Sequence, residues 1–318
     1  MSTPHVRWSL GAVIGLALSL SSPGVVSAQV CSCGGAPLLS SLEFGGVAEG
    51  NLRFSLAYEY HDISDVVWGT EQRKNDSRWQ VSQSGLFMAS YGLTPTMSIS
   101  AIVTLVQKER AAGDRLLVRG LGDGLLIANV SLLPPNPSTQ QELVVSAGIK
   151  GPIGSSTLSL DGTLIAADLQ PTSGAWDGIV SAYFATGVGV GSPLRLFTSA
   201  AYRWTGTNQR YAFGDLGYKT GNELVATLGA GYAWGARLSA TLMGEYRTIT
   251  SDQIGGFETA TTGGQWLDLT PGVNIRLSNA LSLGLSGQLP LYRRLAGPLQ
   301  LTTNYSVAAV LFYELGAG

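Results

Sequence analysis

The sequence has little charge, histidine or cysteine, and each shortage restricts what the protein can be. Of its 318 residues only 13% are charged, and the formal net charge is −2. Soluble proteins usually carry about a quarter charged residues, so this content indicates a surface that meets something other than water. A nearly neutral chain with so few charges also argues against a nucleic-acid partner, and we expect none.

Long apolar runs are missing outside the first thirty residues. Serine, threonine, asparagine or a charged residue interrupts every few positions, so no stretch reaches the roughly 18 residues that a membrane-spanning helix needs. Within lipid the backbone must satisfy its own hydrogen bonds, which leaves a closed β-barrel as the alternative. If the chain lies in a membrane, it crosses as a barrel.

The first thirty residues have the composition of an export signal. Arg7 is followed by an apolar segment over residues 10–20 and by a small-residue cleavage site that ends at Ala28. We expect removal rather than anchoring, because the apolar core is short and a good cleavage site follows. The predicted organisation is a signal peptide, a leader and a single barrel domain: residues 1–28, 29–50 and 51–318.

The two cysteines, Cys31 and Cys33, lie in the leader within the segment Cys-Ser-Cys-Gly-Gly. A disulfide between them is disfavoured because their side chains point apart. A Cys-x-Cys pair without histidine or further cysteines is only a weak candidate for a metal site, so we predict no metal and no cofactor. Lipidation fits poorly, since small residues do not precede Cys31. The leader either enters the barrel as a plug or lies in the periplasm.

The rest of the chain alternates apolar and polar residues with a period of two. In residues 52–61 leucine, phenylalanine and tyrosine share one face, opposite mainly polar residues, as in a strand between lipid and a polar interior. About twelve such segments have lengths near that of a tilted membrane strand. They are residues 52–61, 79–91, 97–105, 126–132, 143–149, 178–184, 194–204, 224–234, 238–246, 267–275, 281–289 and 305–315.

Short and long connections alternate between these segments. The short ones are residues 92–95, 133–140, 187–193, 235 and 278–280. The others are mostly long, polar and rich in glycine: residues 62–77, 108–122, 151–174, 205–221, 248–263 and the shorter 293–298. Tyrosine and tryptophan also gather at both predicted strand ends on the outward face. The sequence therefore predicts an all-β, transmembrane antiparallel barrel in the cell outer membrane, with both chain ends in the periplasm.

Loops and turns carry a set of short motifs, of which LQPTSGAWD is the most specific. The set comprises SYGLT at residues 90–94, GLGDG at 120–124, SAGIKGP at 146–152, LQPTSGAWD at 169–177, DLTPGV at 268–273 and GQLPLY at 287–292. It resembles a family of outer-membrane proteins assigned to the MetA pathway of phenol degradation. The resemblance spans roughly residues 50–315. It implies an outer-membrane location and uptake of aromatic or other hydrophobic compounds, and it names no catalytic residue. The leader cysteines and the C-terminal Leu315-Gly316-Ala317-Gly318 depart from the family pattern.

Charged residues of both signs fall on the predicted inward face. They either line a pathway that favours anionic or polar solutes, or form a salt-bridged network that fills a narrow lumen. The width of the barrel does not distinguish an open pathway from a filled lumen. Side chains can fill a barrel of eight strands, open porins have sixteen, and about twelve strands lie between these numbers. The lumen-lining candidates are Arg53, Glu59, Lys150, Arg195, Arg203, Glu245, Arg247, Asp268 and Arg276, and Glu314 shares their face.

His61 is the single histidine that remains after the predicted cleavage. A lipid-hydrolysing barrel with a serine nucleophile is the remote alternative, but the sequence fixes no serine partner, so we expect no enzyme. We expect a channel or transporter for small, hydrophobic or aromatic molecules, with outer-membrane lipid and small solutes as its partners. The second class of function is a structural or binding barrel with a blocked lumen.

Overall fold

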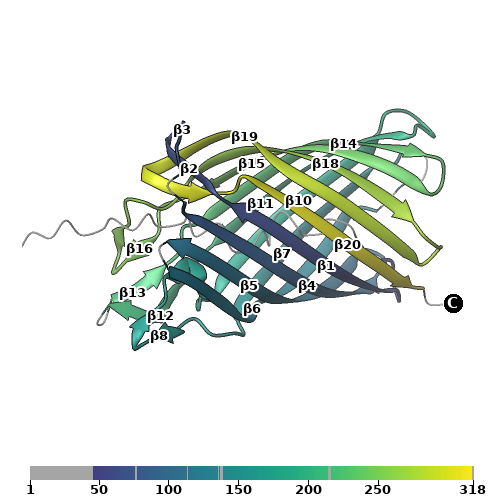
Figure 1. The fold of residues 1–318 in the computed structure, drawn as a ribbon. Coiled ribbons are helices and arrows are strands. Elements are labelled where there is room, and N and C mark those ends of the chain that lie inside the picture. The colour runs from purple at the N-terminus through teal and green to yellow at the C-terminus, as the bar shows by residue number, and fades with distance from the viewer. Residues whose placement is uncertain are drawn as a thin grey trace, which may run out of the picture.

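Twelve antiparallel strands close into a barrel (Figure 1). The computed structural model describes residues 46–75, 77–112, 114–134, 136, 139–213 and 216–316. Going round the barrel, the strands are β1 (Leu52–Ile63), β4 (Trp79–Thr94), β5 (Met97–Ala112), β6 (Asp114–Leu133), β7 (Glu142–Pro152), β10 (Asp177–Gly187), β11 (Leu194–Trp204), β14 (Glu223–Trp234), β15 (Leu238–Ile249), β18 (Gly264–Arg276), β19 (Leu281–Thr302) and β20 (Tyr305–Leu315). Strand β20 pairs with β1 and closes the ring, which confirms the predicted fold class.

Each of the twelve predicted segments lies within one of these strands. Two predicted connections are wrong, because residues 108–122 and 293–298 lie mainly in strands. Strands β5 and β6 stay paired as far as Ala112 and Asp114, with polar pairs such as Gln107 opposite Arg119. The polar residues of β5 and β6 show where the apolar outer surface of the barrel ends. Hydrogen bonding between the two strands continues beyond that point, so the polar segment is strand and not loop.

Side chains alternate between the outside and the inside of the barrel. In β1 Leu56 and Tyr58 are exposed, whereas Ser55 and Glu59 are buried. Large exposed apolar side chains are found on the barrel strands, up to 70% exposure for Leu228. Monomeric soluble proteins rarely expose contiguous apolar surface of such extent, so the outside of this barrel is suited to lipid.

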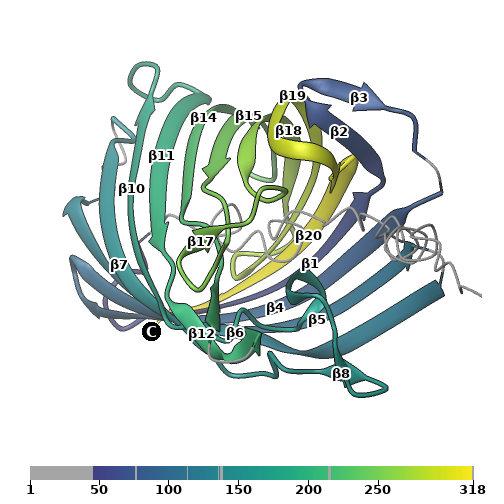
Figure 2. The same cartoon turned by 90° about the vertical axis from the view of Figure 1, so that its left-hand side faces the viewer.

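The two ends of the barrel differ, and we name them by their connections. At the turn end, short connections join the strands and β20 ends. At the loop end, the longer connections form further elements (Figure 2). These are β2 (Asp65–Gly69), β3 (Glu71–Arg73), β8 (Ser159–Leu160), β9 (Thr163–Leu164), the 3-10 helix η1 (Ala167–Leu169), β12 (Thr207–Phe213), β13 (Leu216–Lys219), β16 (Gln253–Ile254) and β17 (Phe257–Glu258). Among the described residues, no helix has the length and apolar character needed to cross a membrane.

Hydrogen bonds tie the loop-end elements to the barrel rim and to one another. Strands β12, β13, β16 and β17 form a four-stranded sheet, and β2 pairs with the outer part of β19. Lys108 on β5 donates to the carbonyl oxygens of Asp168 and Gln170 at 2.8 Å each, which fixes η1. Asp252 accepts hydrogen bonds from the Gly221 amide at 2.7 Å and from the Tyr218 hydroxyl. Burial and the Asp252 charge raise the pKa of Tyr218, so its hydroxyl remains a donor.

The end of the predicted leader lies against β4 at the turn end. Glu49 forms a parallel bridge with Gly92, and the Gly50 amide donates to the Gly92 carbonyl at 2.9 Å. Val47 is buried, at 5% exposure. The predicted signal peptide, most of the leader, Cys31 and Cys33 lie outside the described residues.

Replacing Gly92 by alanine is expected to detach this leader end, because an added Cβ would overlap the carbonyl oxygen of Ala48. Such overpacking typically costs about 1–3 kcal/mol. Hydrogen exchange of the Gly50 amide should be faster in G92A than in the wild type. Gly85→Ala on the same strand is the matched control, since nothing lies within 4 Å of the added Cβ. Equal exchange in both variants would refute the close-approach argument.

Candidate functional site: the barrel interior

A buried lysine on β7 is the centre of one interior ion-pair group. The Nζ atom of Lys150 lies 2.9 Å from a carboxylate oxygen of Asp123 on β6 and 2.9 Å from one of Asp177 on β10. It also donates to the Ser173 hydroxyl. Lys150 has 0% side-chain exposure. A buried cation needs this kind of matching, because its desolvation is otherwise too costly.

Two arginines share one carboxylate on the neighbouring strands. Arg203 Nη2 lies 2.9 Å from Glu223, and Arg247 Nε lies 2.7 Å from the same side chain. Arg203 Nε is also 4.0 Å from Asp177, which links this group to that of Lys150. The result is a charge network that runs along the interior from β6 to β15. Interior charges are thus paired across neighbouring strands along this part of the barrel wall.

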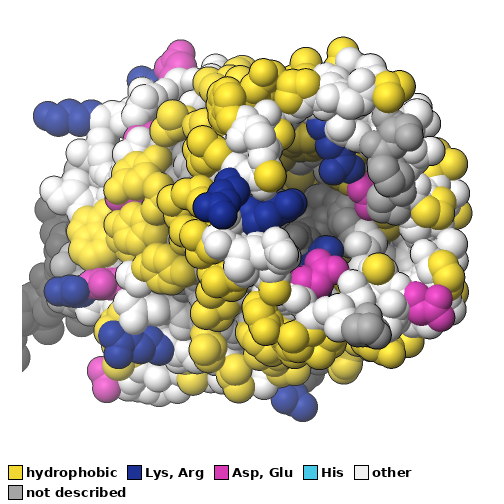
Figure 3. Space-filling view, turned by 90° about the vertical axis from the view of Figure 1, so that its right-hand side faces the viewer, with side chains coloured by type: hydrophobic (Ala, Val, Ile, Leu, Met, Phe, Trp, Pro, Cys, Tyr) yellow, Lys and Arg dark blue, Asp and Glu magenta, His cyan; other side chains and the backbone are white. Residues whose placement is uncertain are grey.

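Further arginines surround a cavity of about 700 Å³ at the turn end. Arg53 pairs with Glu314 at 2.9 Å, and Arg195 pairs with Glu142 at 2.8 Å. Arg276 also lines this cavity, together with Arg237 from the β14–β15 connection. Figure 3 looks onto this end, where Lys and Arg side chains (dark blue) gather beside the opening. Four arginines and one carboxylate, that of Glu314, therefore line the turn-end cavity.

Acidic side chains gather on a different part of the interior. Glu245 on β15 is directly opposite Asp268 on β18, and the Gln288 amide on β19 donates to them at 3.2 and 3.3 Å. On β1, His61 Nε2 lies 3.7 Å from Glu59. We call Glu59, Glu245 and Asp268 the acidic arc. Like charges on facing strands repel, and the nearby charge of Arg247 offsets part of this repulsion at Glu245 and Asp268.

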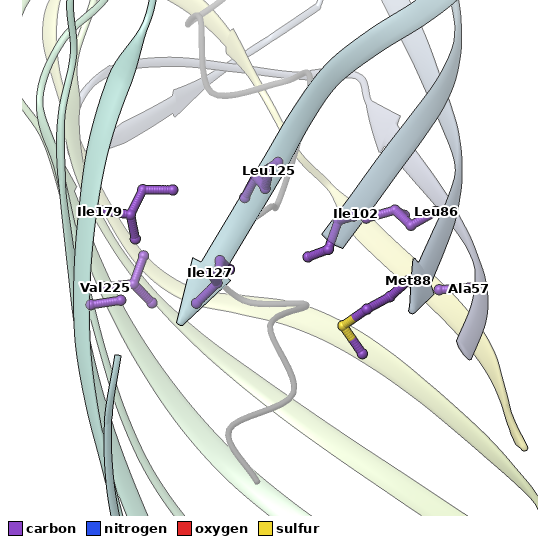
Figure 4. Close-up of a cluster of buried hydrophobic side chains, with 9 residues drawn as sticks. Ala57, Leu86, Met88, Ile102, Leu125, Ile127, Ile179 and Val225 are labelled. Carbon is purple, nitrogen blue, oxygen red and sulfur yellow. The ribbon is translucent and has the colours of Figure 1, made fainter. Parts of the chain in front are cut away.

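The interior also has an apolar part, which we call the apolar arc (Figure 4). It consists of the buried residues Ala57, Leu86, Met88, Ile102, Leu125, Ile127, Ile179, Ala201 and Val225. The inward face therefore carries an apolar patch beside the polar and charged side chains that the alternation predicts. Both parities are apolar in segments such as Leu86 to Met88. That local loss of alternation is the sequence signal that could have revealed the arc.

The structure places the nine predicted lumen candidates in different surroundings. Lys150, Arg203 and Arg247 belong to the charge network, and Glu245, Asp268 and Glu59 to the acidic arc. Arg53, Arg195 and Arg276 lie at the turn-end mouth. Sequence reasoning missed the partners Asp123, Glu142, Asp177 and Glu223, which flank the predicted strands. Among the described residues, no group of three His, Cys, Asp or Glu side chains could hold a metal ion.

Comparison with known proteins informs the fold. No protein-family model matches the chain, and no curated protein matches it in sequence, so the resemblance to the phenol-pathway family remains a prediction. The solved structure of the COG4313 outer membrane channel from Pseudomonas putida F1 is similar to it, with a TM-score of 0.72 and 13% identity over 86% of this chain and 98% of that one. The NanC porin has a TM-score of 0.46 and 7% identity over 83% and 100% of the two chains. The β domain of the Bordetella autotransporter BrkA has a TM-score of 0.47 and 12% sequence identity over 84% of this chain and 100% of that one. The similarity to the COG4313 channel shows a shared barrel fold, whereas the similarities to the other two structures are too low to support a conclusion.

Proposed function

We propose that the chain is a passive outer-membrane channel for small solutes, including hydrophobic or aromatic ones. The observation that carries the proposal is the inversion of the usual protein surface. Leu228 and similar large apolar side chains face outward, whereas Lys150 and its ion-pair partners lie inside. Such an inversion suits a closed barrel that has lipid outside and a polar pathway within. The similarity in fold to an outer membrane channel supports this location.

The interior surfaces support the solute class. The turn-end cavity of about 700 Å³ offers an entrance, and the apolar arc offers contact area to a hydrophobic or aromatic group. Water-filled pathways lined only by charge would favour small ions. An apolar surface beside charged ones accommodates solutes that have both kinds of surface.

Solute entry into proteoliposomes tests this proposal. We expect benzyl alcohol and a small sugar alcohol both to enter vesicles that contain the folded barrel. Ile102→Asn, within the apolar arc, should lower the rate of benzyl alcohol entry relative to that of the sugar alcohol by about fourfold. The loss of one methylene of apolar contact costs about 0.8 kcal/mol, which corresponds to that factor. Rates are taken as the excess over protein-free vesicles, and both solutes are measured on one preparation. Folded barrel that admits neither solute would favour the blocked-lumen class instead.

A further inference from the structure

A small cavity lies against the acidic arc, and one carboxylate in its lining, that of Glu245, has an oxygen with no hydrogen-bond partner among the described residues. The cavity measures about 100 Å³, and Glu59, His61, Glu245, Thr270 and Gln288 contribute to its lining. No lysine or arginine is among the described lining residues. The charged acids in the cavity lining are therefore Glu59 and Glu245, beside polar and apolar side chains.

Glu245 points to a missing ligand at this cavity. Its side chain is buried, at 1% exposure, and Oε1 accepts the Gln288 amide. Its Oε2 atom accepts no hydrogen bond from any residue that the structure describes. The same holds for the hydroxyl of Thr270. Buried polar atoms nearly always have partners, so each of these two atoms needs a partner that the described residues do not supply, either water or a solute.

The cavity adjoins the apolar arc on two strands. On β1, Glu59 of the cavity is two residues from Ala57 of the arc, on the same face. On β20, Ala308 of the cavity is two residues from Val310, which packs against the arc. A molecule in the lumen can thus contact carboxylates at one end and apolar side chains at the other.

We propose that the acidic arc and the apolar arc together bind small organic cations, namely protonated amines with an apolar or aromatic body. The ammonium group donates to Glu245 Oε2 and to the Thr270 hydroxyl, and it neutralises part of the charge of Asp268 and Glu59. The apolar body lies along the arc near Ala57. This inference rests on the proposed function because the solute must be able to enter the lumen.

Isothermal titration of the folded, detergent-solubilised barrel with 2-phenylethylammonium chloride tests the site. We expect saturable binding to the wild type. We expect affinity at least about tenfold weaker in Glu245→Gln, since the lost hydrogen bond is to a charged group. The neutral analogue 2-phenylethanol and the anion phenylacetate should bind more weakly than the cation. Glu258→Gln is the matched control, because Glu258 is an exposed carboxylate on β17.

A second variant keeps the test decisive if E245Q does not fold. Thr270→Val preserves the side-chain shape and removes the unpartnered hydroxyl, so it should also weaken binding of the cation. Heat-modifiable gel migration reports whether each variant is folded. Absence of wild-type binding, or equal affinity in both variants and E258Q, would overturn the site. Binding without solute entry into vesicles would overturn only the channel proposal, whereas entry without binding would overturn only the cation site.

Discussion

Replacing Lys150 by methionine is expected to lower the free energy of unfolding by about 3–5 kcal/mol, the usual cost of leaving buried charge uncompensated. The ammonium group has 0% exposure and lies 2.9 Å from both Asp123 and Asp177. Methionine is an unbranched side chain one atom shorter than lysine, so it keeps most of the length and removes the charge. Urea titration of the folded barrel in lipid vesicles, followed by tryptophan fluorescence, measures the difference.

Two further variants separate this effect from a general loss of packing. Lys74→Met removes the same charge from an exposed position between β3 and β4, and it should change stability by no more than about 0.5 kcal/mol. Neutralising both carboxylates in the triple variant K150M/D123N/D177N should recover most of the loss. Wild-type stability in K150M would show that the charge network does not hold the barrel strands together.

Replacing Leu228 by arginine is expected to lower the free energy of unfolding from the bilayer by about 2–4 kcal/mol. Leu228 lies near the middle of β14 with 70% exposure, so the proposed location places its side chain in lipid. The matched control is Leu160→Arg, at an equally apolar side chain of 56% exposure on the loop-end strand β8. Leu160→Arg should change the free energy of unfolding by no more than about 0.5 kcal/mol, as ordinary surface substitutions do.

The same pair of variants discriminates between lipid and water at the outer surface. In vesicles of longer-chain lipid the cost of L228R should persist, because the position remains within the hydrocarbon. Equal stability of the L228R and L160R variants would contradict a lipid-facing barrel wall.

The barrel was predictable because its apolar outer surface and its polar interior impose opposite requirements on alternate residues of every strand. Residues 52–61 show this directly, and the structure turns Leu56 outward and Glu59 inward as the period requires. The loop-end sheet could not be predicted in this way. Its strands are as short as Gln253–Ile254, and long-range bonds such as that from Gly221 to Asp252 hold it in place. Two-residue strands contain no measurable period.

The sequence predicted which charged residues face inward, but not which of them contact one another. Alternation places Lys150 on the inward face, but Asp123 and Asp177 come from sequence positions 27 residues away on either side. Barrel stagger, which local sequence does not encode, brings these three side chains together. The apolar arc was missed for a different reason. Around Met88 both alternating faces are apolar, so an apolar side chain must face the lumen there, but the alternation does not identify which residue it is.

Single-channel recording in planar bilayers shows directly whether the folded barrel conducts. We expect discrete, uniform conductance steps on insertion of the purified folded protein. We expect the same steps from G92A and E258Q, since neither change closes the lumen. Verified insertion of folded barrel without any conductance steps would show that the lumen is blocked and that the protein is not a channel.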